Sequence, residues 1–221
     1  RKIQQHQWRS VVLRPRPECH RHLPGSIRGD HRHELVAHAR QWHRRAILRQ
    51  QRRRGNQAGP PVLVNLDQHL EHPEYESYFA AKTRLLASLE QLFGPDARFS
   101  GSMWYPPYAY RLWHTNETQP GWRMYLLDFD EEVGPSDMRT FFRYMNPQTK
   151  EIVTLQDRPK MLRFFKVEQA KDRLLWHCIV NGANRHRWAF GFVVPDDWQS
   201  RLPAAAAQAL TGLSTEAVDA R

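Results

Sequence analysis

The sequence predicts a mainly β protein of the α+β class, in which an antiparallel sandwich or barrel is flanked by two preceding helices. From residue 98 onward, short β-rich runs alternate with turns rich in Pro, Gly, Asn and Asp, and no helical pattern separates them. Before residue 98, apolar residues recur at helical spacing in two segments. Strands at short, regular intervals favour antiparallel pairing, which leaves the helices to cover one side.

The two helical segments have recognisable ends. The first, "HRHELVAHARQWHRRAILRQQRRR", follows Asp30 as an N-cap and stops at Gly55. A short buried strand is expected at residues 62–66. Pro73 then opens the second helix, "EYESYFAAKTRLLASLEQLF", which Gly94 ends. Both patterns are amphipathic, so each helix is expected to dock one apolar side.

The remaining chain divides into strands and two flanking regions. An irregular start with a short strand at "SVVLR" is expected, together with a loose helix in the Ala-rich tail. The expected strands are 98–104, 108–114, 122–129, 139–145, 151–155, 160–167, 173–180 and 185–194. The expected organisation is a basic, partly irregular arm with one amphipathic helix (1–60), a β domain with its supporting helix (61–198) and the tail (199–221).

Positive charge is concentrated at the start of the chain. Residues 1–60 hold 15 of the 33 Lys and Arg but only three acidic residues, whereas the rest of the chain is slightly acidic. This arm predicts attraction of residues 1–55 to nucleic acid or to an acidic protein surface. A solvated basic helix without a dedicated partner explains the same charge equally well.

Composition also restricts the class of protein. No run approaches the roughly 18 apolar residues of a membrane span, and no secretory signal is visible, so we expect no membrane partner. The two cysteines, Cys19 and Cys178, are too far apart in sequence to indicate a disulfide framework or a cysteine zinc site. We therefore expect a soluble, cytoplasmic protein. The chain has no Gly-rich phosphate loop and no G-x-S-x-G elbow, which disfavours nucleotide hydrolysis and serine-hydrolase chemistry.

Two histidines are candidate metal ligands because of their positions in the expected strands. His114 ends one expected strand and precedes the polar turn "TNETQPG", whereas His177 lies in the apolar run "RLLWHCIV". Neutral imidazoles on neighbouring strands can bind a divalent iron. For each histidine taken alone, a hydrogen-bonded structural role is the favoured interpretation, so the pair has to be judged together with its neighbours.

The segments "DRPKMLRFFKV", "LLWHCIV" and "RHRWAFGF" resemble the second half of the iron(II)/2-oxoglutarate-dependent oxygenases, and the similarity covers roughly residues 98–195. The resemblance implies a double-stranded β-helix, or jelly-roll barrel. It implies iron(II) held by His114 and His177, and an arginine ten residues later, Arg187, that binds the far carboxylate of 2-oxoglutarate. Arg185 is the obvious substitute, since an arginine forms a planar fork that fits a carboxylate.

The chain departs from the family pattern at the third ligand. The family has a carboxylate two residues after the first histidine, where this sequence has Asn116, followed by Glu117. A neutral amide oxygen binds iron(II) more weakly than a carboxylate. Four outcomes remain open: ligation by Asn116, ligation by Glu117, a water or exogenous anion in that position, or no metal.

If the metal binds, the resemblance implies a hydroxylase that converts 2-oxoglutarate to succinate while it oxidises an unidentified substrate. Tyr110 and Arg123, beside the first histidine, are candidates to contact 2-oxoglutarate or the substrate, although sheet packing or surface charge explains them as well. No side chain is assigned a catalytic role of its own, because the redox chemistry belongs to the metal and the co-substrate. The alternative function is a non-catalytic member of the same fold, which serves a larger assembly and is anchored by the basic arm.

Overall fold

Two facing antiparallel sheets form the body of the computed structural model, which describes residues 11–13, 63–68, 71–130 and 139–203. The larger sheet has the order β1 (Val11–Leu13), β8 (Met161–Val167), β5 (Gly121–Phe129), β10 (Arg187–Val194), β3 (Arg98–Tyr105) and β2 (Val64–Asn65). The smaller sheet has the order β4 (Tyr110–His114), β9 (His177–Asn181), β6 (Thr140–Met145) and β7 (Ile152–Gln156). The helical elements are α2 (Tyr75–Phe93) and the 3-10 turns η2 (Leu66–Gln68) and η3 (Lys171–Arg173).

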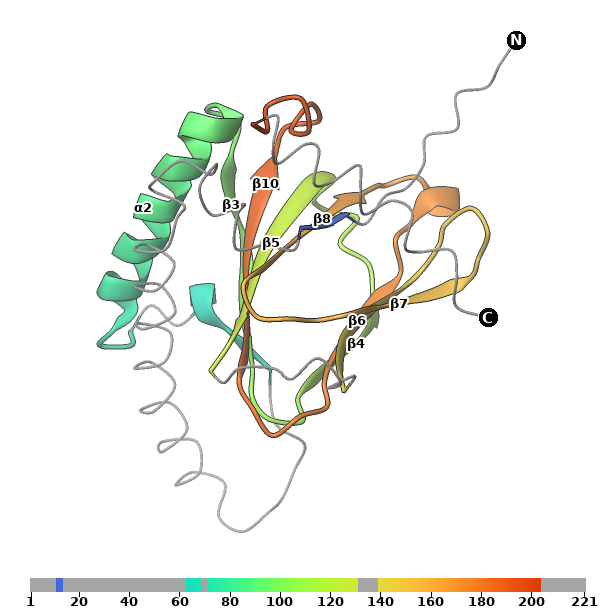
Figure 1. The fold of residues 1–221 in the computed structure, drawn as a ribbon, viewed down its shortest axis with the longest axis horizontal. Coiled ribbons are helices and arrows are strands. Elements are labelled where there is room, and N and C mark those ends of the chain that lie inside the picture. Colours follow the sequence, from blue (N-terminus) through green and yellow to red (C-terminus); the bar gives the residue numbers. More distant parts are fainter. Residues whose placement is uncertain (1–10, 14–62, 69–70, 131–138, 204–221) are drawn as a thin grey trace.

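The chain passes repeatedly from one sheet to the other. Apart from the consecutive pair β6 and β7, successive strands from β3 to β10 change sheet at every step. This connectivity is that of a jelly-roll sandwich, and Figure 1 shows its two layers facing each other. The mainly β, antiparallel fold is therefore confirmed. Closure into a barrel is not shown, because the described strands pair as two separate sheets.

The expected elements agree with the observed ones to within a few residues, with one larger shift. The second helix and the short N-terminal strand are both present. The strand expected at 173–180 begins only at His177, because residues 171–173 form η3 and Trp176 donates its amide hydrogen to the Leu174 carbonyl. The first expected helix, the rest of the basic arm and the Ala-rich tail beyond residue 203 lie outside the described residues.

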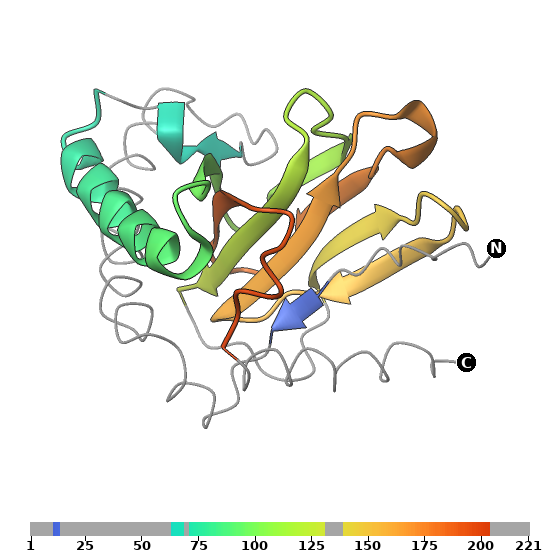
Figure 2. The ribbon, with the colours of Figure 1, turned by 90° about the horizontal axis from the view of Figure 1, so that it is seen from above.

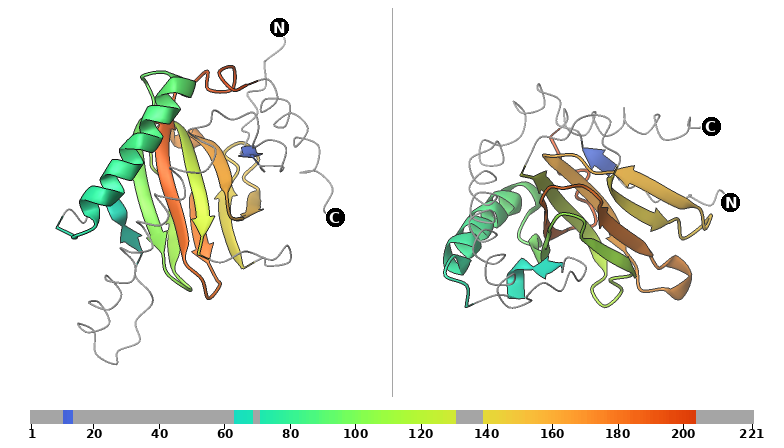
Figure 3. Two further views of the ribbon diagram at one scale, coloured as in Figure 1. Left: turned by 60° about the vertical axis from the view of Figure 1, so that its left-hand side comes forward. Right: turned by 90° about the horizontal axis from the view of Figure 1, so that it is seen from below.

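One hydrophobic core lies between α2 and the larger sheet. Figure 2 and Figure 3 show α2 along the outer face of that sheet. Its buried residues at helical spacing, such as Leu85, Leu89 and Phe93, pack in one cluster with Phe190 and Phe192 of β10. Burial of one such side chain contributes about 1.5–3 kcal/mol. Among the residues that the structure describes, no helix has the length and apolarity needed to cross a membrane.

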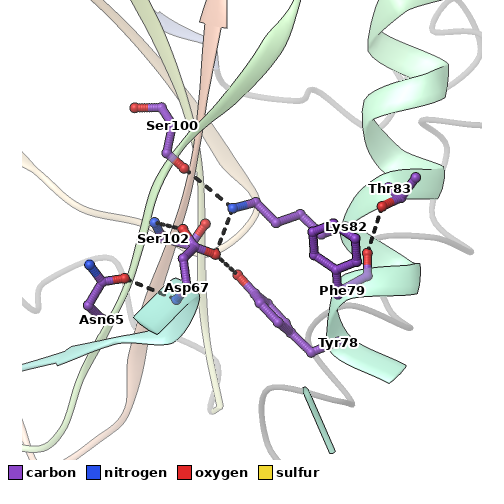
Figure 4. A network of polar contacts seen from close by, with 8 residues as sticks. All are labelled: Asn65, Asp67, Tyr78, Phe79, Lys82, Thr83, Ser100 and Ser102. Carbon is purple, nitrogen blue, oxygen red and sulfur yellow. Dashed lines mark hydrogen bonds and ion pairs between the residues drawn. The ribbon is translucent and has the colours of Figure 1, made fainter. Parts of the chain in front are cut away.

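A polar network also attaches α2 to the larger sheet. The Asp67 carboxylate accepts hydrogen bonds from Lys82 Nζ at 2.8 Å, from the Tyr78 hydroxyl at 2.9 Å and from the Ser102 amide at 2.8 Å (Figure 4). Lys82 also donates to the Ser100 carbonyl at 3.3 Å. Asp67 in η2 thus joins α2 to β3, and β3 forms one wall of the space between the sheets.

The second core lies between the two sheets and is incompletely filled. Phe142 of β6 and Ile179 of β9 contribute from the smaller sheet, while Leu127 of β5 and Phe165 of β8 contribute from the larger sheet. The rings of Phe142 and Phe165 are stacked with centroids 5.4 Å apart. Beside these residues the sheets enclose a cavity of about 290 Å³. The sandwich therefore positions inward-facing side chains around an internal site.

Candidate functional site

The two histidines expected as ligands lie directly opposite each other on neighbouring strands. His114 at the end of β4 is paired in register with His177 at the start of β9. Residues opposite each other on antiparallel strands share a face of the sheet, so their side chains meet. The ring centroids are 4.2 Å apart. Strand pairing thus brings together two residues that are 63 positions apart in the sequence.

Backbone carbonyls determine the tautomer of both imidazoles. His114 Nδ1 lies 2.7 Å from the Leu112 carbonyl oxygen, and His177 Nδ1 lies 2.9 Å from the Leu175 carbonyl oxygen. A carbonyl can only accept, so each Nδ1 carries the hydrogen and each Nε2 retains a lone pair. Histidines that bind metals are oriented by the same kind of bond from the other ring nitrogen. His114 Nε2 is buried and has no hydrogen-bond partner among the described residues.

Both imidazoles are neutral at physiological pH. Burial, with smaller contributions from the nearby His114 and Arg111, lowers the pKa of His177 to about 3. Burial also lowers the pKa of His114 to about 4. Metal ions bind the neutral form of imidazole, so a shift of the pKa in this direction keeps both lone pairs available near pH 7.

Asn116 is the third candidate metal ligand and lies beside the two imidazoles. Its Nδ2 lies 3.3 Å from His177 Nε2, so the amide donates a hydrogen bond to the second histidine. A half-turn of the amide would present the carbonyl oxygen instead. Glu117 is exposed and does not line the cavity. Over the described ranges, no three His, Cys, Asp or Glu side chains cluster closely enough to hold a metal. The candidate ligands are therefore two imidazoles and one amide, and in this arrangement the amide nitrogen, not its oxygen, faces His177.

The cavity between the sheets reaches two members of this group, His177 and Asn116, but not His114, and it is lined by positive charge. His177 and Asn116 contribute to its wall, together with Tyr105 of β3 and Tyr125 of β5. The charged residues in the lining are Arg111, Arg123, Arg163 and Arg187, and the lining contains no Asp or Glu. Such a cavity, with His177 at one part and guanidinium groups elsewhere, favours a small anionic ligand.

Two of these arginines share one buried carboxylate. Asp157 Oδ1 lies 2.6 Å from Arg163 Nη2, and Asp157 Oδ2 lies 2.7 Å from Arg187 Nε. Burial alone would raise the pKa of the Asp157 carboxyl, but the charges of the two arginines and their hydrogen bonds hold the pKa below its usual range. Asp157 is therefore ionised, and the three residues together carry one net positive charge.

Of the other residues expected at the site, two line the cavity and two do not. Arg187 and Arg123 both line the cavity, and Arg123 also donates hydrogen bonds to the Gln119 and Trp122 carbonyls. Arg185 precedes β10 and does not line the cavity; its guanidinium lies 5.4 Å from the centroid of the Phe129 ring. Tyr110 is 46% exposed and also lies outside the lining.

Sequence reasoning did not identify Arg163, Asp157 or Tyr125. One signal for Arg163 was present. Along β8, every second residue points to the same face, so Arg163 shares its face with Met161 and Phe165, which are core residues. A charged residue at an inward-facing position is almost never fully buried without a partner. Asp157 carries no comparable signal, since it follows β7 in a turn segment that is typically exposed.

Comparison with known proteins finds similarity in structure only. No family model matches the chain, and no curated protein matches it. A prolyl-4-hydroxylase from Pseudomonas putida is 12% identical, covers 79% of this chain and 89% of its own, and has a TM-score of 0.42. The rice dioxygenase for auxin oxidation is 14% identical, covers 81% and 72%, and has a TM-score of 0.45. EvdO2 from Micromonospora carbonacea, complexed with 2-oxoglutarate, is 13% identical, covers 62% and 69%, and has a TM-score of 0.32. Similarity at this level does not assign the chain to a family.

Proposed function

We propose that this protein is an oxygenase of the iron(II)/2-oxoglutarate-dependent type that hydroxylates an unidentified substrate. The observation that supports the proposal most strongly is the pair of neutral imidazoles, His114 and His177, which face each other on neighbouring strands, with His177 in the wall of a cationic cavity. A third candidate ligand, Asn116, lies beside them. The resemblance of the sequence to the oxygenase family points to the same two histidines.

Each residue has a definite part in this proposal. His114 and His177 would hold iron(II) through Nε2, and Asn116 would contribute its carbonyl oxygen after a half-turn of the amide. Bound iron(II), with 2-oxoglutarate and oxygen, would supply the oxidising power for hydroxylation, with release of succinate and carbon dioxide. Arg187 would hold the far carboxylate of 2-oxoglutarate, since it lines the cavity and Arg185 does not.

The first experiment is an anaerobic titration of the protein with iron(II) and 2-oxoglutarate, read as a visible charge-transfer band. We expect a weak band, and succinate when oxygen is admitted. His177→Ala should lose the band, whereas His72→Ala, a control before α2, should keep it. A protein with neither band nor succinate is not an oxygenase.

The third ligand can be tested by changing its charge. Asn116→Asp adds the carboxylate that the site lacks, so iron(II) should bind at least about ten-fold more tightly, which corresponds to about 1.4 kcal/mol. Glu117→Gln should leave the affinity unchanged, because Glu117 is exposed and outside the cavity lining. A loss of affinity in Glu117→Gln would instead identify Glu117 as the ligand.

One observation favours a second candidate, a non-catalytic binding protein of the same fold. The Asn116 amide donates its hydrogen to His177 Nε2 and so occupies the lone pair that a metal would need. In this function the cavity binds a small anion without turnover. Anion binding in the absence of the band and of succinate would favour this candidate.

The basic arm gives either candidate a proposed anchor on nucleic acid or an acidic protein surface. Deletion of residues 1–55 would also remove β1, which pairs with β8 in the larger sheet. A sharper variant replaces Arg52, Arg53 and Arg54 with Gln and leaves β1 in place. Binding to duplex DNA or to polyglutamate should weaken and lose part of its salt dependence. Unchanged binding to both would exclude the anchor.

A further inference from the structure

The outer face of the smaller sheet carries exposed aromatic side chains. In the described part of the chain, α2 is the one α-helix, and it packs on the far side of the larger sheet from the smaller one (Figure 3). Of the seven large hydrophobic residues that are exposed among the described residues, six lie on the smaller sheet or directly beside its strands. Three of the six are aromatic residues in or next to β4 and β9: Tyr110, and Trp113 and Trp176, which are each 41% exposed.

Strand pairing turns these rings away from the cavity. Ile179 of β9 lines the cavity, so the next residue, Val180, points to the outer face. Tyr110 of β4 and Phe141 of β6 are both paired with Val180, so their rings lie on that outer face on either side of it. The Trp176 carbonyl accepts a hydrogen bond from β6, which extends the pairing of β6 with β9 to this residue. Since Trp176 directly precedes the inward-facing first residue of β9, alternation turns its ring outward as well.

An irregularity in β4 adds Trp113 to the same surface. The pairing of β4 with β9 shifts between Arg111 and His114, so Leu112 and Trp113 lie opposite a single residue of β9. Arg111 lines the cavity and His114 also points inward, although strict alternation would put residues three positions apart on opposite faces. The extra residue of this bulge leaves the side chains of Leu112 and Trp113 exposed.

The charge on and around this face is positive. The outward-facing strand residues include Arg143 and no Asp or Glu. The Arg143 guanidinium lies 4.7 Å from the centroid of the Phe141 ring. The strands and adjoining turns of the smaller sheet, residues 110–117, 139–160 and 171–181, hold eight Lys and Arg but four Asp and Glu. A partner that fits this face therefore combines negative charge with flat apolar groups.

Single-stranded nucleic acid has both properties. Its bases stack on exposed aromatic rings, and its phosphates are attracted to arginine and lysine. Side chains on one face of a strand are about 7 Å apart, a spacing that lets successive bases of an extended strand reach successive rings. In a duplex the bases are stacked on each other and are not free to bind rings. An acidic peptide supplies the charge without the flat faces.

We infer that the outer face of the smaller sheet binds single-stranded nucleic acid, with bases stacked on Tyr110, Trp113 and Trp176 and phosphates attracted to Arg143. The surface lies on the opposite side of the smaller sheet from the cavity, so it does not depend on the proposed oxygenase. It also differs from the basic arm, because salt weakens the attraction between charges more than it weakens stacking.

Binding is measured on the full chain by fluorescence polarisation of a labelled oligothymidylate of about 12 nucleotides. A salt concentration of about 0.3 M weakens the contribution of the basic arm. The second probe is the same strand in a duplex with oligoadenylate. The wild type should bind the single strand at least about ten-fold more tightly than the duplex, because only the single strand offers its bases for stacking.

Tyr110→Ala and Trp113→Ala should each weaken binding of the single strand about five-fold or more, because a stacking ring is lost. Tyr110→Phe keeps the ring and should retain the affinity. Phe79→Ala is the matched control, since Phe79 is a ring of similar exposure, 42%, on α2. Arg143→Gln should lower the slope of the affinity against salt concentration by about one phosphate contact.

Three results would overturn the inference: no binding of the single strand, equal affinity for single strand and duplex, or unchanged binding in both Tyr110→Ala and Trp113→Ala. Polyglutamate is the competitor. If it binds as tightly as oligothymidylate and depends on the same two rings, the partner is an acidic peptide and the inference is wrong. The measurement contains no iron(II) and no 2-oxoglutarate, so its result and that of the oxygenase assay are independent.

Discussion

Removal of Asp67 should destabilise the protein more than removal of its partner Lys82. The Lys82 side chain is 2% exposed and the Asp67 side chain is 30% exposed, with Nζ and Oδ1 2.8 Å apart (Figure 4). In Asp67→Ala the ammonium group stays buried without a counter-charge, and the Ser102 amide loses its acceptor. In Lys82→Met the remaining carboxylate keeps its bonds from Tyr78 and Ser102 and is partly hydrated.

The expected loss in the free energy of unfolding follows from the different exposure of the two side chains. Breaking a buried pair by removal of one partner costs about 3–5 kcal/mol. Water reaches Asp67, so we expect the lower end for Asp67→Ala, about 3 kcal/mol. The pKa of Lys82 is lowered by burial, which limits the penalty because the amine can lose its proton. Lys82→Met exchanges a partly exposed ion pair for apolar packing and should change the free energy of unfolding by about 1 kcal/mol or less.

The assay is thermal unfolding of the wild type, both single variants and the double variant, followed by tryptophan fluorescence. Asp67→Ala should lower the melting temperature by roughly 6–12 °C for a loss of about 3 kcal/mol. The double variant should be more stable than Asp67→Ala, because the unpaired ammonium group is gone. Equal losses in the two single variants, or a double variant less stable than Asp67→Ala, would refute this reasoning.

Two further predictions concern the site. The pKa of His177 is lowered to about 3 from 6.5, so below pH 6.5 the unfolded imidazole gains a proton that the folded one does not. The free energy of unfolding should therefore fall by about 1.4 kcal/mol per pH unit from pH 6.5 toward 3 on account of this residue. His177→Gln should show a smaller slope in acid-dependent unfolding, and identical slopes would contradict the shift. Gly191→Ala should cost about 1–3 kcal/mol, because a Cβ there would lie 2.5 Å from the Gly101 carbonyl and 2.8 Å from the Tyr125 ring. Gly101→Ala has no atom within 4 Å of the new Cβ, so thermal unfolding should find it as stable as the wild type.

Local sequence patterns were sufficient to predict the helix and the strands, but not which strands pair with each other. The second helix and the strands after residue 98 could be predicted, since a helix or a strand depends on the spacing of apolar residues within a short segment. His114 and His177 could be proposed as ligands from their residue type and from the order and spacing that the sequence shares with the oxygenase family. Their contact depends on the pairing of β4 with β9, which are separated by four strands of the chain.

The sequence by itself determined which segments are strands, which face of each strand is apolar, and which side chains can bind a metal or an anion. Only the tertiary structure decided that Asp157 lies between Arg163 and Arg187, that Arg187 lines the cavity, and that Tyr110 faces away from it. The physical reason is that alternation along a strand divides residues between two faces without specifying what lies opposite. The partner across the sandwich is set by how ten strands share two sheets in the described part of the chain.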